Sequence, residues 1–329
     1  MGKVFGIAGC TNAGKTTLSK NLTDKIANVY GYDVIHLLQD DFFHEKEKVA
    51  RIPHSTNKAI VFYDYDSCQA LDISRMKNAV IEARDHHDLV ILEGNLLTLM
   101  PEMIEIIDEM VFLSLDKATC EDRRVQRTDY DPPDLPGYFE QVVWPAYEDT
   151  LRAAQRIGGN VEIVEGNRED LINYALIKVF ECFNNFVRLT HEEISVEEVS
   201  NIISSDQSGG QSLFIGTTRN NFEDKKVVSL SYEAYEPMAY QELWLICKET
   251  RARFPDLHRI CIYHLLGDCP VGKKSVVIGT SSSHRKDAIH ATEFIIDNLK
   301  ARVPIWKKEI YDQGESKWKE NQESLNHLF

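Results

Sequence analysis

Short apolar runs alternate with longer amphipathic stretches over the first half of the chain. Helical patterns separate five such runs, at residues 4–8, 34–38, 89–92, 110–115 and 161–164. Short, continuously apolar strands that alternate with helices are typical of a parallel sheet with helices on both faces. A last helical pattern at residues 168–186 ends this part. We therefore predict an α/β domain over residues 1–186.

The second half follows a different pattern, in which strands outnumber helices. We predict strands at residues 212–217, 227–235, 259–266, 275–280 and 306–311, and helices at residues 237–254 and 284–301. Pro237 stands at the start of the first helix, where its missing N–H costs little. Runs of strands interrupted by two helices indicate an α+β domain. We predict this domain over residues 187–329, with the junction between residues 186 and 195.

Composition excludes several classes of protein. The chain has 37 Lys and Arg against 52 Asp and Glu, a net charge of -15, so a broad basic face for nucleic acid is not expected. No apolar run reaches the roughly 18 residues of a membrane span, and Gly-Lys-Thr comes too early for a signal peptide. The seven cysteines are scattered and never spaced C-x-x-C. They predict reduced thiols in a cytoplasmic protein, without a zinc site.

The segment from Gly9 to Thr16 reads GCTNAGKT and matches the phosphate-binding pattern G-x-x-x-x-G-K-[ST]. It follows a predicted strand and opens a predicted helix, which is the context the pattern requires. Backbone N–H groups at such a helix start bind phosphate oxygens, so we expect ATP as the ligand. Lys15 would reach the β- and γ-phosphates, and Thr16 would bind Mg²⁺. The expected nucleotide-binding residues here are Gly9, Asn12, Ala13, Gly14, Lys15, Thr16 and Thr17.

Two carboxylates come directly after neighbouring predicted strands. Asp40 follows the second strand, and Glu93 ends the third. Strand ends in a parallel sheet point into the ligand crevice. Asp40 could accept a proton from an attacking hydroxyl, and Glu93 could help to position Mg²⁺.

The first domain resembles nicotinamide riboside kinase, a member of the uridine-kinase-like P-loop kinases. The segments that carry the resemblance are GCTNAGKTTLSKNL, QDDFF, YDYDSCQALD, LVILEGNLL and YDPPDLPGYFEQVVWPAY. It implies transfer of the ATP γ-phosphoryl group to the 5′-hydroxyl of a pyridine riboside. Asp40 would be the base, with Glu93 beside Mg²⁺ and the acceptor. Uridine, cytidine or pantothenate as the acceptor, or a nucleotide-binding regulator without kinase activity, are the alternatives.

The same resemblance assigns the riboside and phosphate contacts. Tyr65 and Tyr130 would flank the pyridine ring, and Asp66 and Asp134 would lie near the ribose. Aromatic faces beside carboxylates suit a cationic pyridinium ring. The arginines expected to close on the phosphates are Arg123, Arg124 and Arg127.

A basic cluster stands out in the second half of this acidic chain. His284 and Arg285 begin a predicted helix that ends at Lys300 and Arg302, and Lys307 follows Pro304. Because Pro304 must end the helix and turn the chain, the basic residues at positions 285, 300, 302 and 307 could converge on an anion. A basic amphipathic helix with solvated lysines is the alternative.

The second domain resembles the large, catalytic subunit of molybdopterin synthase. The segments that carry the resemblance are SLFIGTTRNN, LSYEAYEPMA, IYHLLGDCPVG, VVIGTSSSHRKDA, IDNLKARVPIWKKEIY and SKWKEN. That family adds two sulfurs to cyclic pyranopterin monophosphate to form molybdopterin. The sulfur comes from a small ubiquitin-like subunit whose C-terminal Gly-Gly carries a thiocarboxylate. Because this chain ends in Asn326-His-Leu-Phe329, we expect a separate carrier.

The resemblance assigns roles to the basic residues. Lys300 and Lys307 would be catalytic, with Lys300 beside the thiocarboxylate. The pterin phosphate would contact Arg219, His284, Arg285, Lys300 and Lys307. The family also implies a homodimer of this domain within a heterotetramer. Leu265 stands where the family commonly has arginine, and a non-catalytic module that binds a ubiquitin-like protein is the alternative.

Overall fold

The computed structural model describes residues 2–127, 134–222, 225–312, 314 and 316–319 of the chain. The chain divides into two compact units, Met1–Cys182 and Phe183–Phe329. The predicted junction after residue 186 falls inside β8 (Asn185–Thr190), a strand of the second unit. The helix predicted at residues 168–186 is α6 (Leu171–Cys182), so the prediction was too long. Asn184, with φ of 57°, turns the chain between these two elements.

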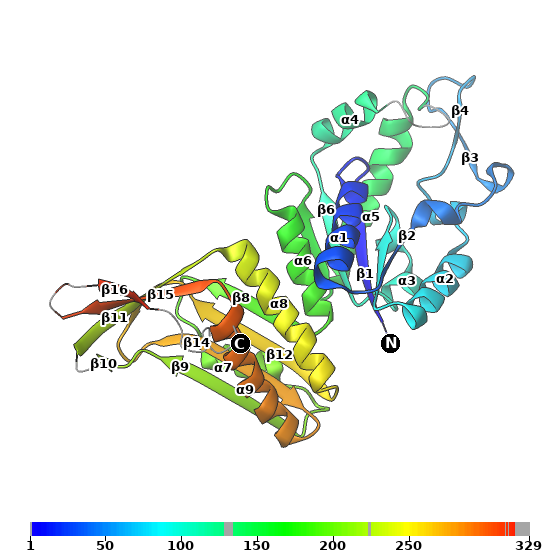
Figure 1. The fold of residues 1–329 in the computed structure, drawn as a ribbon. Helices are drawn as coiled ribbons and strands as arrows, with labels where there is room; N and C mark the ends of the chain where they lie inside the picture. The colour runs from blue at the N-terminus through cyan, green and yellow to red at the C-terminus, as the bar shows by residue number, and fades with distance from the viewer. Residues whose placement is uncertain (1, 128–133, 223–224, 313, 315, 320–329) are drawn as a thin grey trace. The chain divides into compact units, whose positions relative to one another are not determined.

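A parallel sheet of five strands forms the centre of the first unit, as predicted. Its order is β2-β5-β1-β6-β7, and Figure 1 labels β1, β2 and β6. The strands are β1 (Lys3–Gly9), β2 (Val34–Leu38), β5 (Leu89–Glu93), β6 (Glu109–Ser114) and β7 (Val161–Glu165). All five residues of β5 are buried, because the strand is covered on both faces. This explains the continuous apolar run in its sequence.

Helices cover both faces of the parallel sheet. The helix α1 (Lys15–Tyr30) contacts β2, β5 and α6, and α2 (Ile73–His86) contacts β5 and β1. Because connections between parallel strands are right-handed, the two helices lie on opposite faces. The remaining helices are α3 (Pro101–Ile104), α4 (Lys117–Gln126) and α5 (Trp144–Ile157). Short helical turns are η1 (Gln39–Phe42), η2 (Lys46–Lys48), η3 (Cys68–Ala70), η4 (Leu97–Leu99) and the π-helical η5 (Phe139–Val143). A hairpin of β3 (Arg51–Pro53) and β4 (Val61–Tyr63) is separate from the main sheet.

The second unit is α+β, as predicted, and contains two sheets. The first sheet has the order β8-β12-β14-β9, with β8 parallel to β12 and the other pairs antiparallel. Its other strands are β9 (Gly210–Thr217), β12 (Leu257–Leu265) and β14 (Lys274–Ser282). The second sheet joins β10 (Asn221–Phe222), β11 (Lys225–Ala234), β13 (Gly267–Pro270), β15 (Ile305–Tyr311) and β16 (Ser316–Lys319).

Three helices enclose the first sheet of the second unit. The helices α8 (Glu236–Arg253) and α9 (Arg285–Arg302) contact each other, and α9 packs on β9 and β14. Thr280 of β14 donates a hydrogen bond to the Ala288 carbonyl of α9, so even-numbered residues of this strand face α9. The odd-numbered residues, among them Val277, face away from α9.

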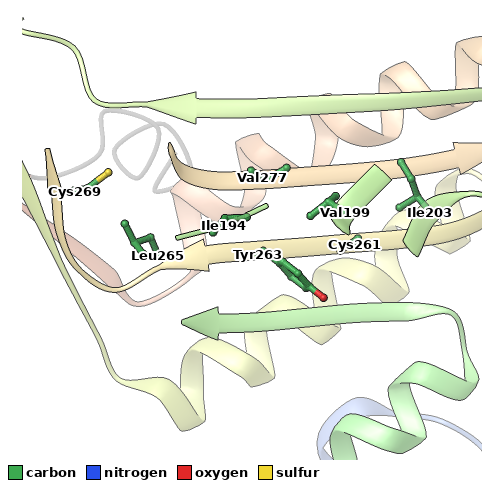
Figure 2. Packing of buried hydrophobic residues seen from close by; sticks show 8 residues of the cluster. All are labelled: Ile194, Val199, Ile203, Cys261, Tyr263, Leu265, Cys269 and Val277. Carbon is green, nitrogen blue, oxygen red and sulfur yellow. The ribbon is translucent and has the colours of Figure 1, made fainter. Parts of the chain in front are cut away.

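The opposite face of this sheet is covered by α7 (Val196–Ile203), which was not predicted. Val199 and Ile203 of α7 are fully buried in a cluster with strand residues of β12 and β14 (Figure 2). A Cβ at Gly279 would lie 2.9 Å from Val199 Cγ1, so glycine at this position allows the helix to approach the sheet. The short helix has an N-cap: Ser195 Oγ accepts a hydrogen bond from Glu198 N at 3.1 Å.

Candidate functional site

The phosphate loop of the first unit connects the end of β1 to the start of α1. Gly9 has φ of 129° and Gly14 has φ of 92°, values that favour glycine. A Cβ at Gly9 would lie 2.1 Å from the Leu113 carbonyl oxygen, so position 9 is too close to β6 to carry a side chain. Lys15 Nζ donates hydrogen bonds to the carbonyls of Gly9 (3.2 Å) and Cys10 (2.8 Å). Ala13 is buried in the loop, and Thr17 is exposed in the first turn of α1.

Glu93, at the end of β5, contacts three polar side chains from two elements, α1 and β2. Thr16 Oγ1 donates to Oε1 at 2.5 Å, and Ser19 Oγ donates to Oε2 at 2.8 Å. His36 Nε2 of β2 lies 3.2 Å from Oε2. Burial opposes ionisation of Glu93, but the bonds from His36, Thr16 and Ser19 outweigh it and lower its pKa. The carboxylate is therefore held charged beside the phosphate loop.

Asp40 and Lys15 bring opposite charges to the same end of the sheet. Asp40 lies in η1, directly after β2. Partial burial raises its pKa, and the nearby carboxylates Glu93 and Asp41 act in the same direction against Lys15. Burial lowers the pKa of Lys15, although Glu93 and Asp40 oppose this shift. A carboxylate with a raised pKa is suited to accept a proton.

The three predicted arginines of α4 and its end lie against the phosphate loop. Arg123 Nη1 donates to the Asn12 carbonyl at 3.1 Å, and Arg127 Nη1 lies 3.4 Å from Asn12 Oδ1. Arg124 Nη1 donates to Thr11 Oγ1 at 3.0 Å. These contacts bring three positive charges to the loop expected to hold the phosphates.

A hydrogen-bond chain joins Asp66 to residues that the sequence analysis did not select. Asp66 accepts from Asn95 Nδ2 and from the Tyr138 hydroxyl, each at 3.0 Å. Gln39 Nε2 donates to Asn95 Oδ1 at 2.6 Å, and Gln39 is fully buried. Burial raises the pKa of Asp66, although Arg124 opposes it. Gln39, Asn95 and Tyr138 lie in the segments QDDFF, LEGNLL and PGYF. Each is in or next to a segment from which a site residue was selected, and this proximity in sequence could have identified them.

The expected riboside contacts are only partly brought together. Tyr65 packs edge-on against Phe43, with ring centroids 5.3 Å apart. Asp134 binds Arg124 through two hydrogen bonds, of 2.5 and 3.0 Å, so its carboxylate is engaged with the arginine helix. Tyr130 lies outside the described residues. A pocket beside Asp66 is lined by Gly9, Thr11, Asn95, Leu96, Tyr147 and Thr150.

In the second unit, Lys300 and Lys307 flank one turn. Lys300 lies in the last turn of α9, and Lys307 lies on β15 after the turn at Pro304. Both are half-buried, whereas Trp306 beside them is 52% exposed. Arg219 follows the end of β9 and is exposed. The start of β9, at Gly210, lies close to Arg285 at the first residue of α9.

Within one chain, His284 and Arg285 lie far from that turn, and Arg302 in the turn is paired with carboxylates. Arg285 and Lys300 are at opposite ends of α9, about 22 Å apart at 1.5 Å per residue. His284, the N-cap of α9, is therefore also far from Lys300 within one chain. Arg302 binds Glu242 and Glu249 of α8, at 3.2 and 2.6 Å. Within one chain, positions 285 and 300 do not converge, because α9 separates them, and the Arg302 guanidinium is engaged by carboxylates of α8.

Lys307 shares a strand face with buried polar groups. Glu309, two residues along β15, is 5% exposed and accepts a hydrogen bond from the Tyr311 hydroxyl at 2.5 Å. Tyr232 of β11 is paired with Lys307, and its ring contacts His264 edge-on at 5.0 Å. Burial lowers the pKa of His264 to about 4, so this histidine is neutral near pH 7. Lys307 therefore supplies the positive charge on this face of β15.

Comparisons with known proteins agree with this division of the chain. A family model described as an AAA domain matches residues 6–142, and the first unit has the fold of a P-loop kinase with a parallel sheet. A model described as MoaE protein matches residues 189–302. None of the helices in the described ranges is long and apolar enough to cross a membrane.

Relatives identify the second unit. The molybdopterin synthase catalytic subunit of Bos taurus is 47% identical over 164 residues, covering 50% of this chain and 86% of that protein. Catalytic subunit 2 of Aedes aegypti is 50% identical over 141 residues, covering 42% of this chain and 91% of that protein. The chain therefore belongs to the molybdopterin synthase catalytic subunit family.

A solved structure is similar to the first unit. It is a possible uridine kinase from Bacillus stearothermophilus, with 20% identity and a TM-score of 0.34, covering 50% of this chain and 89% of that chain.

Proposed function

We propose that the chain is a bifunctional enzyme whose second unit transfers sulfur to cyclic pyranopterin monophosphate. The single observation that carries this proposal is the pair of half-buried lysines, Lys300 and Lys307, on either side of one turn in a chain of this family. The cyclic phosphate and a thiocarboxylate are both anions. Cations must offset their repulsion before the two can react in one narrow site.

The sulfur donor in this proposal is a separate small ubiquitin-like subunit with a C-terminal Gly-Gly thiocarboxylate. Lys300 lies beside the thiocarboxylate and the acyl group left after sulfur transfer. Lys307 and Arg219 bind the pterin phosphate. Because His284 and Arg285 are at the far end of α9, we propose that they reach a pterin only through a second copy of this unit, in a homodimer within a heterotetramer.

The first unit, in this proposal, transfers the γ-phosphoryl group of ATP to the 5′-hydroxyl of nicotinamide riboside. Asp40 accepts the hydroxyl proton, and Lys15 with Arg123, Arg124 and Arg127 binds the phosphates. Asp66 is well suited to bind ribose hydroxyls, because Asn95 and Tyr138 hold its carboxylate in place. Tyr65 offers an aromatic face to the pyridinium ring.

Mg²⁺ fits the oxygens at the phosphate loop. Thr16 Oγ1 and the charged Glu93 lie together, and both are hard oxygen ligands of the kind Mg²⁺ prefers. Within the described part of the chain, no three His, Cys, Asp or Glu side chains gather in a way that would hold a metal. An ion here would therefore take other ligands from phosphate and water. When bound, it neutralises charge on the transferred group.

An ATP-consumption screen tests the acceptor. The full chain is incubated with ATP, Mg²⁺ and one acceptor at a time: nicotinamide riboside, uridine, cytidine or pantothenate. The proposal expects turnover with nicotinamide riboside above all others. Turnover restricted to uridine or cytidine would leave phosphoryl transfer in place and change the substrate, and ATP binding without any turnover would favour a nucleotide-binding regulator.

Conversion of cyclic pyranopterin monophosphate tests the second activity. The full chain is mixed with a thiocarboxylated small subunit, and molybdopterin is measured together with binding of that subunit. The proposal expects both conversion and binding. Binding without conversion would favour a non-catalytic module for a ubiquitin-like protein.

A further inference from the structure

Two thiols meet between the phosphate loop and the arginine helix of the first unit. Cys10 follows Gly9 in the loop, and Cys120 lies on α4, the helix that also carries Arg123 and Arg124. Their Sγ atoms are 3.0 Å apart. Both side chains are buried, with 1% and 0% exposure. The pair joins two elements that are far apart in the sequence and that both contribute to the nucleotide site.

The thiol pair is surrounded by the contacts that hold the loop against α4. Cys120 Sγ donates to the Thr11 carbonyl at 3.2 Å, and Arg124 binds the Thr11 hydroxyl. Lys15 Nζ donates to the Cys10 carbonyl at 2.8 Å. As far as the structure describes the chain, no third ligand completes a metal site there. The pair is therefore two thiols in contact, with the cations Lys15 and Arg124 bound to the same loop.

The two thiols are chemically unequal. The hydrogen bond from Cys10 lowers the pKa of Cys120, and the charges of Arg124 and Lys15 lower it further, against the effect of burial. The same contact raises the pKa of Cys10. The thiolate is the nucleophilic form of cysteine, so Cys120 is the attacking sulfur and Cys10 the resolving one.

We propose that Cys10 and Cys120 form an oxidation site, which hydrogen peroxide converts to a reversible disulfide that weakens nucleotide binding at the phosphate loop. The disulfide does not depend on the acceptor of the first unit, but its effect on catalysis rests on the proposed kinase function. The oxidant must be small, because both thiols are buried and a larger molecule would not reach them.

The reaction balances with one peroxide. Cys120 sulfur attacks one peroxide oxygen; an S–O bond forms, the O–O bond breaks, and the released hydroxide takes a proton to become water. Cys10 sulfur then attacks the Cys120 sulfenic acid; the S–S bond forms, the S–O bond breaks, and the hydroxyl leaves as a second water. The two thiols lose two electrons, and the two peroxide oxygens gain them. A dithiol reductant reverses the bond by thiol–disulfide exchange.

The proposed disulfide acts on the loop through the position of the two sulfurs. A disulfide has an S–S distance of about 2.05 Å, so the two sulfurs must approach by about 1 Å. This movement ties α4 to the backbone whose N–H groups are expected to bind phosphate. A displacement of about 1 Å at such a site lowers the rate about 10²-fold.

The test treats the full chain with hydrogen peroxide, blocks remaining thiols, and maps cysteine peptides by mass spectrometry. Binding of ATP is measured by calorimetry before oxidation, after oxidation and after dithiothreitol. Cys120→Ala removes the attacking sulfur without touching a proposed ligand. Cys68→Ala is the matched control, because Cys68 is less buried than either thiol and lies in η3.

The proposal expects a Cys10–Cys120 cross-linked peptide, ATP binding weakened at least about 10-fold, recovery with dithiothreitol, and no response in Cys120→Ala. The Cys68→Ala variant should respond as the natural chain does. Oxidation of Cys68 without the cross-link would overturn the proposal, as would a cross-link that leaves ATP binding unchanged. The cross-link with weakened ATP binding in a chain that phosphorylates no acceptor would keep the oxidation site and reject the kinase.

Discussion

The two candidate sites are built in different ways. In the first unit, Glu93 joins Thr16, Ser19 and His36 through hydrogen bonds, so the site is held together before any ligand binds. In the second unit, Lys300 and Lys307 flank a turn, while His284 and Arg285 are about 22 Å from Lys300 along α9. The first site is thus a preorganised network within one unit. The second is a set of cations that suits a site completed by other chains.

The largest effect should come from the lysine pair. We predict that Lys300→Ala lowers conversion of the pterin substrate by about 10²- to 10⁴-fold, because it removes charge compensation and a proton donor. Binding of the small subunit should change far less, since its interface is much larger than one contact. Lys286→Ala, at the exposed far end of α9, is the matched control. Near-normal turnover in Lys300→Ala would shift the role to Lys307.

The phosphate loop should give the next largest effect. Lys15→Ala removes a cation that the loop carbonyls of Gly9 and Cys10 hold in place. We predict a loss of phosphoryl transfer of at least about 10²-fold, as expected for a preorganised charge contact. Initial rates with ATP and nicotinamide riboside measure it, with Lys20→Ala on the exposed side of α1 as the control. A loss below 10-fold would contradict the assignment of Lys15.

Acid should destabilise the second unit through His264. Burial lowers its pKa to about 4 in the folded unit, against an ordinary value of 6.5. The unfolded chain therefore binds a proton more readily, and stability falls as the pH drops from about 6.5 to 4, by up to about 3 kcal/mol. Hydrogen exchange of β12 peptides at pH 7 and pH 4.5 measures this loss. His264→Gln should flatten the pH response, and an unchanged response would contradict this origin.

The smallest effect concerns the acceptor of the first unit. A cationic pyridinium ring against Tyr65, near the Asp66 carboxylate, should gain about 0.5–2 kcal/mol over a neutral base. We therefore predict a kcat/KM for nicotinamide riboside about 2- to 30-fold above that for uridine. Tyr65→Leu should reduce the difference. A uridine value equal to or above that for nicotinamide riboside would reject the preference.

The elements that sequence could predict are those whose pattern is local and strong. The five parallel strands were predicted because each is a short apolar run, and β5 is buried along its whole length. The helix α7 was missed because it has only eight residues, although Ser195 and Glu198 form a recognisable N-cap pattern. The strand β8 was missed because apolar residues continue from α6 into it, and only Asn184 marks the turn.

The site residues also differ in how local their sequence pattern is. The phosphate loop is contiguous, so its residues could be selected from one motif. The partners of Asp66 could not, because Asn95 and Tyr138 reach it only after the sheet and η5 have formed. Arg302 was misjudged because its ion pairs are with α8, which is distant in the sequence. Charge alone therefore did not distinguish a ligand contact from a structural one.

We propose that the two sites of this chain work independently. The most direct test measures both activities on the same preparations of the natural chain, Lys15→Ala and Lys300→Ala. We expect a crossed result: Lys15→Ala loses phosphoryl transfer and keeps sulfur transfer, and Lys300→Ala does the reverse. Loss of both activities in either variant, with folding intact by circular dichroism, would contradict it.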